Sequence, residues 1–211
     1  MIFRSPRGTS SRAFTLVELL LVISIIALLA ALYLPAAARA KAKAARANCV
    51  SNLRQLGLGF RMFADDNSGK FPMQIPVRYG GSADYIARGE AFRHFQAASN
   101  YLHVTKIIVC PSDRSTTAAD WGMLQNSNVS YFVGLDARLG KPHHLLAGDR
   151  NIVKKNGGQS PVLSLTTNDV VEWTPDIHIE NGNILFADGH VEQLDNERLQ
   201  IAVRSHGRLS P

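Results

Sequence analysis

Residues 13–35 read AFTLVELLLVISIIALLAALYLP, and this stretch decides how the chain is organised. From Phe14 to Leu34 it is almost entirely apolar over 21 residues, about 31 Å of helix at about 1.5 Å per residue, which is enough to cross the core of a bilayer. No second run of that length follows Pro35. The sequence therefore predicts one membrane-spanning helix. A cleaved secretory signal is the alternative, but its apolar core is shorter and ends in small residues.

One acidic residue, Glu18, interrupts the apolar run. A carboxylate at the centre of a membrane helix costs about 2.5 to 3.5 kcal/mol, so it needs either an escape to water or a cationic partner. About 6 Å of helix separates Glu18 from Phe14, so Glu18 lies near the end of the apolar run. Its carboxylate can therefore reach the headgroups and water. The partner would be the α-amino group produced by a cut between Ala13 and Phe14. The residues alone favour neither interpretation.

The segment FTLVELLLVISIIALLAALYLP (residues 14–35), preceded by a short leader with arginines, resembles the N-terminus of type IV prepilins and type II secretion pseudopilins. The resemblance implies that a prepilin peptidase cuts before Phe14 and methylates the new amine. It implies that Glu18 pairs with the N-terminus of a neighbouring subunit and that Pro35 lies at a bend. The sequence departs from the family at Ala13, where the family usually has Gly, and the efficiency of cleavage depends on this residue.

The resemblance and the chain length give four expected parts. They are a leader peptide (1–13), a transmembrane or filament-core helix (14–34), a helical stalk (35–65) and a globular α+β domain (66–211). The formal net charge is +6, and loss of the leader with Arg4, Arg7 and Arg12 would leave 20 basic against 17 acidic residues, a net charge of +3. So balanced a charge gives little support for nucleic-acid binding.

The expected stalk is rich in Ala, Lys, Arg and Leu, which are good helix formers. Five apolar residues in it are spaced 4, 3, 4 and 3 apart, so they share one helix face that should carry the core of the domain. They are Cys49, Leu53, Leu56, Phe60 and Phe63. Arg54 and Arg61 lie on the opposite, polar face. The stretch DDNSGKFP (65–72) should end the helix, with Gly69 in a left-handed conformation.

Four basic residues follow Pro35 with no acidic residue nearby: Arg39, Lys41, Lys43 and Arg46. By the positive-inside rule they would keep this flank in the cytoplasm, whereas the three arginines of the leader argue for the other side. The resemblance implies a bacterial inner-membrane protein with its C-terminal domain outside the cytoplasm. We therefore interpret the patch as a contact with lipid headgroups or another subunit, with a solvated stalk surface as the alternative.

The remainder of the chain contains no repeat and reads as a compact α+β domain. Residues 82–103 have a helical pattern. Short apolar or alternating runs at 106–110, 129–135, 143–149, 161–165 and 183–194 predict strands separated by Gly, Pro, Asn and Asp. Because the runs are short and helices do not alternate with them, we expect antiparallel hairpins. The expected fold is pilin-like: a long N-terminal helix continuing into a stalk packed on a small antiparallel sheet.

The last of these runs, NILFADGHVEQL, places Asp188-Gly189 between two strand-like pieces, which is typical of a tight hairpin turn. Nine residues separate His178 from Asp188, and this element (178–189) resembles the C-terminal H-X9-DG element of a large bacterial set of prepilin-type proteins. That set also carries elements like NLRQLGLG (52–59) and CPSD (110–113). The resemblance thus touches both ends and the middle of the chain.

His178, Asp188 and His190 are candidate ligands for zinc or another transition metal, or candidate catalytic groups. The alternative, which we favour, is that Asp188 caps the turn and the histidines make structural hydrogen bonds. Because major pseudopilins bind calcium, the resemblance also raises calcium as a weak candidate. The oxygen ligands would be Asp65, Asp66, Asn67 and Asp188, but their spacing does not match an EF-hand loop. We otherwise expect no cofactor and no metal.

The two cysteines, Cys49 and Cys110, either form a disulfide between the stalk and the domain or remain two buried thiols. An even number in an exported domain favours the disulfide. Closing a loop of about 60 residues would stabilise the domain by roughly 4 kcal/mol.

No GxSxG, P-loop, HExxH or CxxC motif occurs in the sequence, and we expect no enzymatic activity. The first functional hypothesis is a structural subunit of a type IV pilus or a secretion pseudopilus. Its partners would be the prepilin peptidase, copies of itself and other pilins or pseudopilins. The second is a membrane-anchored binding protein or enzyme that uses His178, Asp188 and His190 and never polymerises.

Overall fold

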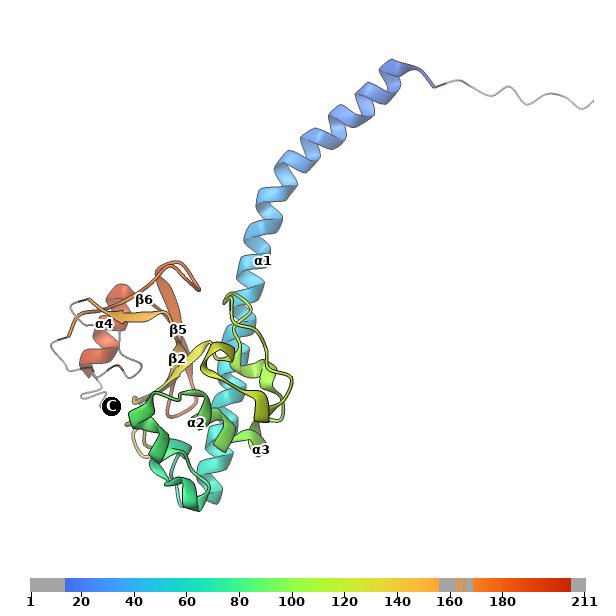
Figure 1. Cartoon of the computed structure of the whole chain (residues 1–211). Helices are drawn as coiled ribbons and strands as arrows, with labels where there is room; N and C mark the ends of the chain where they lie inside the picture. Colours follow the sequence, from blue (N-terminus) through green and yellow to red (C-terminus); the bar gives the residue numbers. More distant parts are fainter. Residues whose placement is uncertain (1–13, 156–162, 164, 166–168, 206–211) are drawn as a thin grey trace, which may run out of the picture. The chain divides into compact units, whose positions relative to one another are not determined.

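The computed structural model describes residues 14–155, 163, 165 and 169–205 (Figure 1). The chain forms two compact units, residues 1–42 and residues 43–211. The predicted leader, including Ala13 on the N-terminal side of the expected cut, lies outside the described residues.

The first helix, α1, spans Leu16–Asp66 and runs through both predicted boundaries at residues 34 and 65. Pro35 lies inside it; this residue has no N–H to donate to the carbonyl of Ala31, yet the helix continues. Beyond Asp66 the chain turns as predicted. Gly69 has a φ of 76°, and its N–H donates to the carbonyl of Ala64 at 2.8 Å, so the left-handed end of the helix is confirmed.

The second half of α1 carries one side of the domain core. The five residues predicted to share a face, Cys49, Leu53, Leu56, Phe60 and Phe63, are all buried. Arg54 and Arg61 are exposed, so the predicted division of this helix into an apolar and a polar face is confirmed.

The domain contains a four-stranded antiparallel sheet in the order β1-β2-β5-β6. The strands are β1 (Tyr131–Val133), β2 (Leu145–Asp149), β5 (Asn181–Phe186) and β6 (Val191–Asp195). A β-bulge interrupts β2 between Leu145 and Ala147. The predicted α+β fold, with a long N-terminal helix packed on a small antiparallel-sheet domain, is confirmed.

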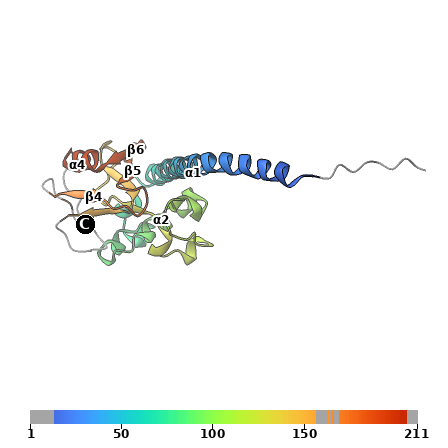
Figure 2. The ribbon, with the colours of Figure 1, turned by 90° about the horizontal axis from the view of Figure 1, so that it is seen from above.

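Both faces of this sheet are covered. On one face Leu185 packs in the core that α1 contributes to, and on the other Ile184 and Phe186 pack in a second core. The second core is closed by a hairpin of β3 (Ile152–Lys154) and β4 (Val171–Trp173) and by α4 (Asn196–Ser205), which contacts β4 and β6 (Figure 2). Two side chains of α4 accept hydrogen bonds from β4: Asn196 from the Trp173 N–H and Gln200 from the Val171 N–H.

Short helices fill the stretch between α1 and β1. They are η1 (Pro72–Gln74), η2 (Val77–Tyr79), η3 (Ala83–Arg88), α2 (Phe92–Ala97), α3 (Ser99–Leu102), η4 (Thr105–Ile108), η5 (Trp121–Met123) and η6 (Asn126–Asn128). The helical prediction for 82–103 is correct in type but covers three short pieces, because Gly89 takes a positive φ of 63° and ends the first of them.

The strand predicted at 106–110 is wrong. Its first three residues belong to η4, whose apolar side chains Ile107 and Ile108 are buried without pairing to a strand. A short apolar run does not distinguish a buried strand from a buried helical turn. The run predicted at 161–165 lies mostly outside the described residues.

Candidate functional site

The N-terminal part of α1 presents apolar side chains to its surroundings along its length. Phe14 is 68% exposed and Leu34 is 67% exposed, and no residue of 14–34 is buried. Within the described residues, α1 is the one helix that is long and apolar enough to cross a membrane.

Glu18 lies in the first turn of this helix and is held by Thr15. The Glu18 carboxylate accepts hydrogen bonds from the Thr15 N–H at 2.9 Å and the Thr15 hydroxyl at 2.8 Å, and the Glu18 N–H donates to the Thr15 hydroxyl oxygen at 3.2 Å. This reciprocal arrangement is a capping box, with Thr15 immediately before the first helical residue. The spacing T-x-x-E at 15–18 is the known signature of this motif, a local signal that could have predicted it.

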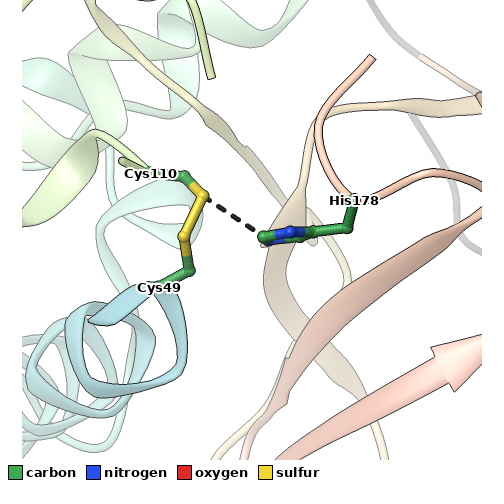
Figure 3. A group of neighbouring side chains, drawn as sticks. All are labelled: Cys49, Cys110 and His178. Atoms are coloured by element: carbon green, nitrogen blue, oxygen red, sulfur yellow. Dashed lines mark hydrogen bonds between the residues drawn. A yellow bond between two sulfur atoms is a disulfide. The ribbon is translucent and has the colours of Figure 1, made fainter. Parts of the chain in front are cut away.

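A second group of chemically active side chains lies inside the domain (Figure 3). The sulfurs of Cys49 on α1 and Cys110 after η4 are joined in a disulfide, and both residues are fully buried. The Nε2 atom of His178 lies 3.5 Å from the Cys110 Sγ. Figure 3 shows the imidazole ring directed at the disulfide from the segment that precedes β5.

Two charged residues complete this group, which we call the disulfide–histidine cluster: Cys49, Cys110, His178, Asp149 and Arg46. Asp149 Oδ2 lies 3.5 Å from His178 Nε2, and the guanidinium of Arg46 donates to the His178 carbonyl at 3.1 Å. The backbone and side-chain amides of Asn183 donate to Asp149 Oδ2 at 2.7 and 2.8 Å.

Burial governs the protonation of the cluster. It lowers the pKa of His178 to about 4, with a further contribution from the positive charge of Arg46. Burial also raises the pKa of Asp149 to about 7, against the hydrogen bonds from Asn183 and the charge of Arg46. His178 is therefore neutral at pH 7, and its contact with Asp149 is not an ion pair.

The three sequence elements that resemble one bacterial set meet at this cluster. Asn52, from the NLRQLGLG element, donates its side-chain amide to the Val109 carbonyl at 3.0 Å, next to Cys110 of the CPSD element. His178 is the first residue of the H-X9-DG element. Elements that are far apart in sequence thus connect α1 to the sheet at one place.

The last residue of the CPSD element, Asp113, anchors a neighbouring part of the domain. Arg150 donates to both carboxylate oxygens of Asp113, at 2.8 and 2.9 Å. Burial alone would raise the pKa of Asp113, but hydrogen bonds from Arg150 and Ser115 and the charge of Arg150 hold it well below its usual range.

The nine-residue spacing of the H-X9-DG element contains strand β5. His178 precedes β5 and Asp188-Gly189 follows it, so a six-residue strand of roughly 20 Å lies between them. The predicted hairpin turn is confirmed: Gly189 has a φ of 95°, and its N–H donates to the Phe186 carbonyl at 2.9 Å.

The structure does not bring His178 together with Asp188 and His190. Asp188 Oδ1 accepts from the His190 N–H at 3.0 Å and contacts the imidazole Nδ1, and the His190 ring stacks on Phe186 with centroids 4.3 Å apart. These contacts give Asp188 the turn-capping position that we favoured for it.

The candidate calcium ligands at 65–67 are each engaged in another contact, and Asp188 lies in the β5–β6 turn. Asp65 faces Arg61 at 3.8 Å, Asp66 accepts from the Tyr101 hydroxyl at 2.7 Å, and Asn67 donates to the Phe63 carbonyl at 2.8 Å. Among the described residues, the group whose ligand atoms lie within 4.8 Å of one another is Cys49, Cys110 and His178.

The basic patch divides into two parts. Arg39, Lys41 and Lys43 are exposed, whereas Arg46 is half-buried and belongs to the disulfide–histidine cluster. The sequence analysis placed Arg46 in the patch because nothing local indicates a partner 132 residues away.

A cavity of about 330 Å³ lies elsewhere in the domain, and the largest part of its lining comes from β1 and the residues next to it, between 129 and 135. Arg150 reaches it, but this guanidinium is already paired with Asp113. Of the other polar residues that line it, His94 is bonded to Ser82 and Asn126 to the Gly89 carbonyl.

Residues 8–34 match a family model described as the prokaryotic N-terminal methylation motif. The match covers the expected cut site and the apolar part of α1, and it supports a prepilin-like protein. No curated protein and no solved structure matches the chain.

Proposed function

We propose, from the methylation motif at residues 8–34, that this prepilin-like chain is a structural subunit of a type IV pilus or type II secretion pseudopilus. A prepilin peptidase would cut between Ala13 and Phe14 and methylate the Phe14 amine. The observation that carries the proposal is an exposed apolar helix, residues 14–34, whose one charged side chain is Glu18 in the first turn.

An apolar surface of this length needs an apolar environment. A helix that is apolar all round is buried either in a large core or in a membrane, and none of the described residues covers this one. Before assembly the cover would be the bacterial inner membrane, with a single span. In a filament the same surface would pack against helices of other subunits.

In this proposal Glu18 is the residue that recognises the neighbouring subunit. Its contacts with Thr15 satisfy hydrogen bonds but leave its negative charge without a cation among the described residues. In hydrocarbon that charge is costly, and the new α-amino group of a neighbouring subunit would offset it. This pairing would fix the position of each new subunit relative to its neighbour.

The domain would lie outside the cytoplasm. A disulfide between Cys49 and Cys110 suits an oxidising compartment, and it ties the second half of α1 to the domain. We assign Arg39, Lys41 and Lys43 to contacts with lipid headgroups or a neighbouring subunit, because they are exposed on the flank of the span.

An enzymatic role at His178, Asp188 and His190 receives no support from the geometry. The three residues lie at opposite ends of β5, and each is engaged in contacts that stabilise the fold. We therefore propose assembly rather than catalysis, and no cofactor.

Substitution of Glu18 in the native host tests the proposal. We expect Glu18→Ala and Glu18→Gln to reach the membrane at the normal level but to be lost from the sheared filament fraction. Glu18→Gln keeps an acceptor for Thr15 and removes only the charge, so it separates capping from charge pairing. The matched control is Glu192→Ala, an exposed carboxylate in β6. Normal incorporation of Glu18→Gln would contradict a pairing based on charge.

A further inference from the structure

The ligand atoms of the disulfide–histidine cluster lie close enough together to meet on one metal ion once the disulfide is broken and its two sulfurs, now 2.00 Å apart, separate. The two Cys sulfurs and a nitrogen of His178 lie within 4.8 Å of one another, and all three residues are buried. Zn²⁺ binds thiolates at about 2.3 Å and imidazole at about 2.0 to 2.1 Å, so a sulfur and a nitrogen on a tetrahedral ion lie about 3.5 Å apart. The distance from Cys110 Sγ to His178 Nε2 is 3.5 Å.

A fourth ligand of the right type stands beside them. Asp149 Oδ2 is 3.5 Å from the same nitrogen of His178, and the carboxylate is fully buried. Its other oxygen, Oδ1, has no hydrogen-bond partner among the described residues, which is rare for a buried polar atom. Carboxylate oxygens are accepted zinc ligands.

We propose that, when the Cys49–Cys110 disulfide is reduced, Cys49, Cys110 and His178 bind a Zn²⁺ ion with Asp149 as the fourth ligand. A dithiol supplies two electrons and two protons, breaks the S–S bond, leaves two thiols and is itself oxidised to a disulfide. Zn²⁺ then displaces the two thiol protons into solvent and forms two Zn–S bonds.

The charges of the cluster agree with this exchange. In the oxidised protein the charges of an ionised Asp149 and of Arg46 cancel. Two thiolates add two negative charges, and a divalent cation restores the balance without any further side chain. Thiolates buried without that cation would be strongly disfavoured, so the reduced protein would hold either neutral thiols or the metal.

The proposed ligands include the two residues that the disulfide joins and add two from the sheet side of the cluster. Cys49 is on α1, Cys110 follows η4, His178 precedes β5 and Asp149 ends β2. A bound ion would therefore hold α1 to the segment after η4 in a reducing environment, as the disulfide does in an oxidising one, and would add β2 of the sheet through Asp149.

Cobalt titration of the full chain in detergent tests the proposal. The protein is reduced with a dithiol, its two thiols are counted after gel filtration under inert gas, and Co²⁺ is added. We expect one equivalent to bind, with thiolate-to-cobalt charge-transfer absorption and the intense visible bands of a tetrahedral ion, and Zn²⁺ to displace it. The oxidised protein should give neither signal.

Variants identify the ligands. His178→Ala should weaken Co²⁺ binding by about tenfold or more, and Asp149→Asn should weaken it and alter the visible bands. The matched control, His190→Ala, removes a histidine outside the cluster and should bind normally. Unchanged binding by His178→Ala would overturn the proposed ligand set.

Two further outcomes would overturn the proposal. One is a reduced, folded protein that has two free thiols and gives no cobalt spectrum. The other applies if reduction unfolds the domain, as followed by circular dichroism. In that case the proposal predicts that one equivalent of Zn²⁺ restores the fold. A chain that stays unfolded with Zn²⁺ present would exclude the site.

Discussion

His94 shows how single residues of this domain depend on burial. Its side chain lies in the interior with 3% of the residue exposed, and its Nδ1 shares a hydrogen bond of 2.8 Å with the Ser82 hydroxyl. Burial lowers the pKa of His94 from 6.5 to about 4. The folded domain therefore favours the neutral imidazole over the protonated one.

This burial predicts a loss of stability in mild acid. Between pH 6.5 and about 4 the unfolded chain binds a proton at His94 that the folded domain does not, so the free energy of unfolding falls as the pH falls. The expected slope from this residue is about 1 kcal/mol per pH unit. Urea denaturation of the detergent-solubilised chain at several pH values measures it.

The variant His94→Gln isolates that contribution, because His178 has a lowered pKa and adds a slope of the same sign. Glutamine can still bond Ser82 but does not titrate. The variant should therefore be less sensitive to acid than the natural chain. An equal pH slope in both proteins would show that His94 does not cause the effect.

Removal of the disulfide should lower the free energy of unfolding by more than the titration of His94 does. Cys49 and Cys110 are 61 residues apart, and the chain-entropy model assigns about 4 kcal/mol to closing such a loop. The double variant Cys49→Ala, Cys110→Ala should lose about that much unfolding free energy in metal-free buffer. A change in urea midpoint equivalent to less than about 1 kcal/mol would mean that the disulfide contributes little.

Among the elements, α1 packs closely against α3 at Gly59. A Cβ atom added at Gly59 would lie 2.3 Å from Leu102 Cδ2 and 3.3 Å from the Tyr101 carbonyl oxygen, so the helix contacts α3 through a bare backbone. Sequence alone presents this glycine as a weak point of the helix, because glycine lowers helix propensity. In the fold it is what lets the two helices approach.

We expect Gly59→Val to destabilise the domain by about 2 kcal/mol, since overpacking a core typically costs about 1 to 3 kcal/mol. The matched control is Leu58→Val, which places the same side chain at a neighbouring position of α1 that is 66% exposed. That change should stay within about 0.5 kcal/mol. Equal midpoints for the two variants in urea denaturation would contradict the packing described for Gly59.

The elements differ in how well the sequence predicts them. The buried face of α1 and the turn at Asp188-Gly189 are predicted correctly because helix period and turn chemistry are local signals. Strands β3 and β4 have three residues each, too few for a periodic pattern. Helix α4 was missed since most of its residues are polar and its apolar side chains are few.

The disulfide–histidine cluster shows a different limit of prediction from sequence. Cys110 and His178 stand out in the sequence because they belong to elements with a family resemblance, and Cys49 stands out because the chain has two cysteines. Asp149 and Arg46 do not, because burial and distant partners make them important. Local patterns do not report which of several acidic and basic residues the fold will bury.

At the scale of the whole molecule, the chain combines an exposed apolar helix with a domain held together by two cores. The domain explains the two downstream elements, CPSD and H-X9-DG, as parts of its own scaffold around Cys110 and His178. The exposed apolar helix is the part that needs other molecules to cover it, and we propose that these are lipids before assembly and other subunits after it. In the proposed function, processing at Phe14 would link these two environments.

Mass spectrometry of the intact protein and of its N-terminal peptide, from native membranes that contain the processing enzyme, tests this account most directly. The account predicts a mature chain that begins at an N-methylated Phe14, with Ala13 accepted at the cut site. A chain that retains residues 1–13 would contradict it, because Glu18 would then have no processed amine to pair with.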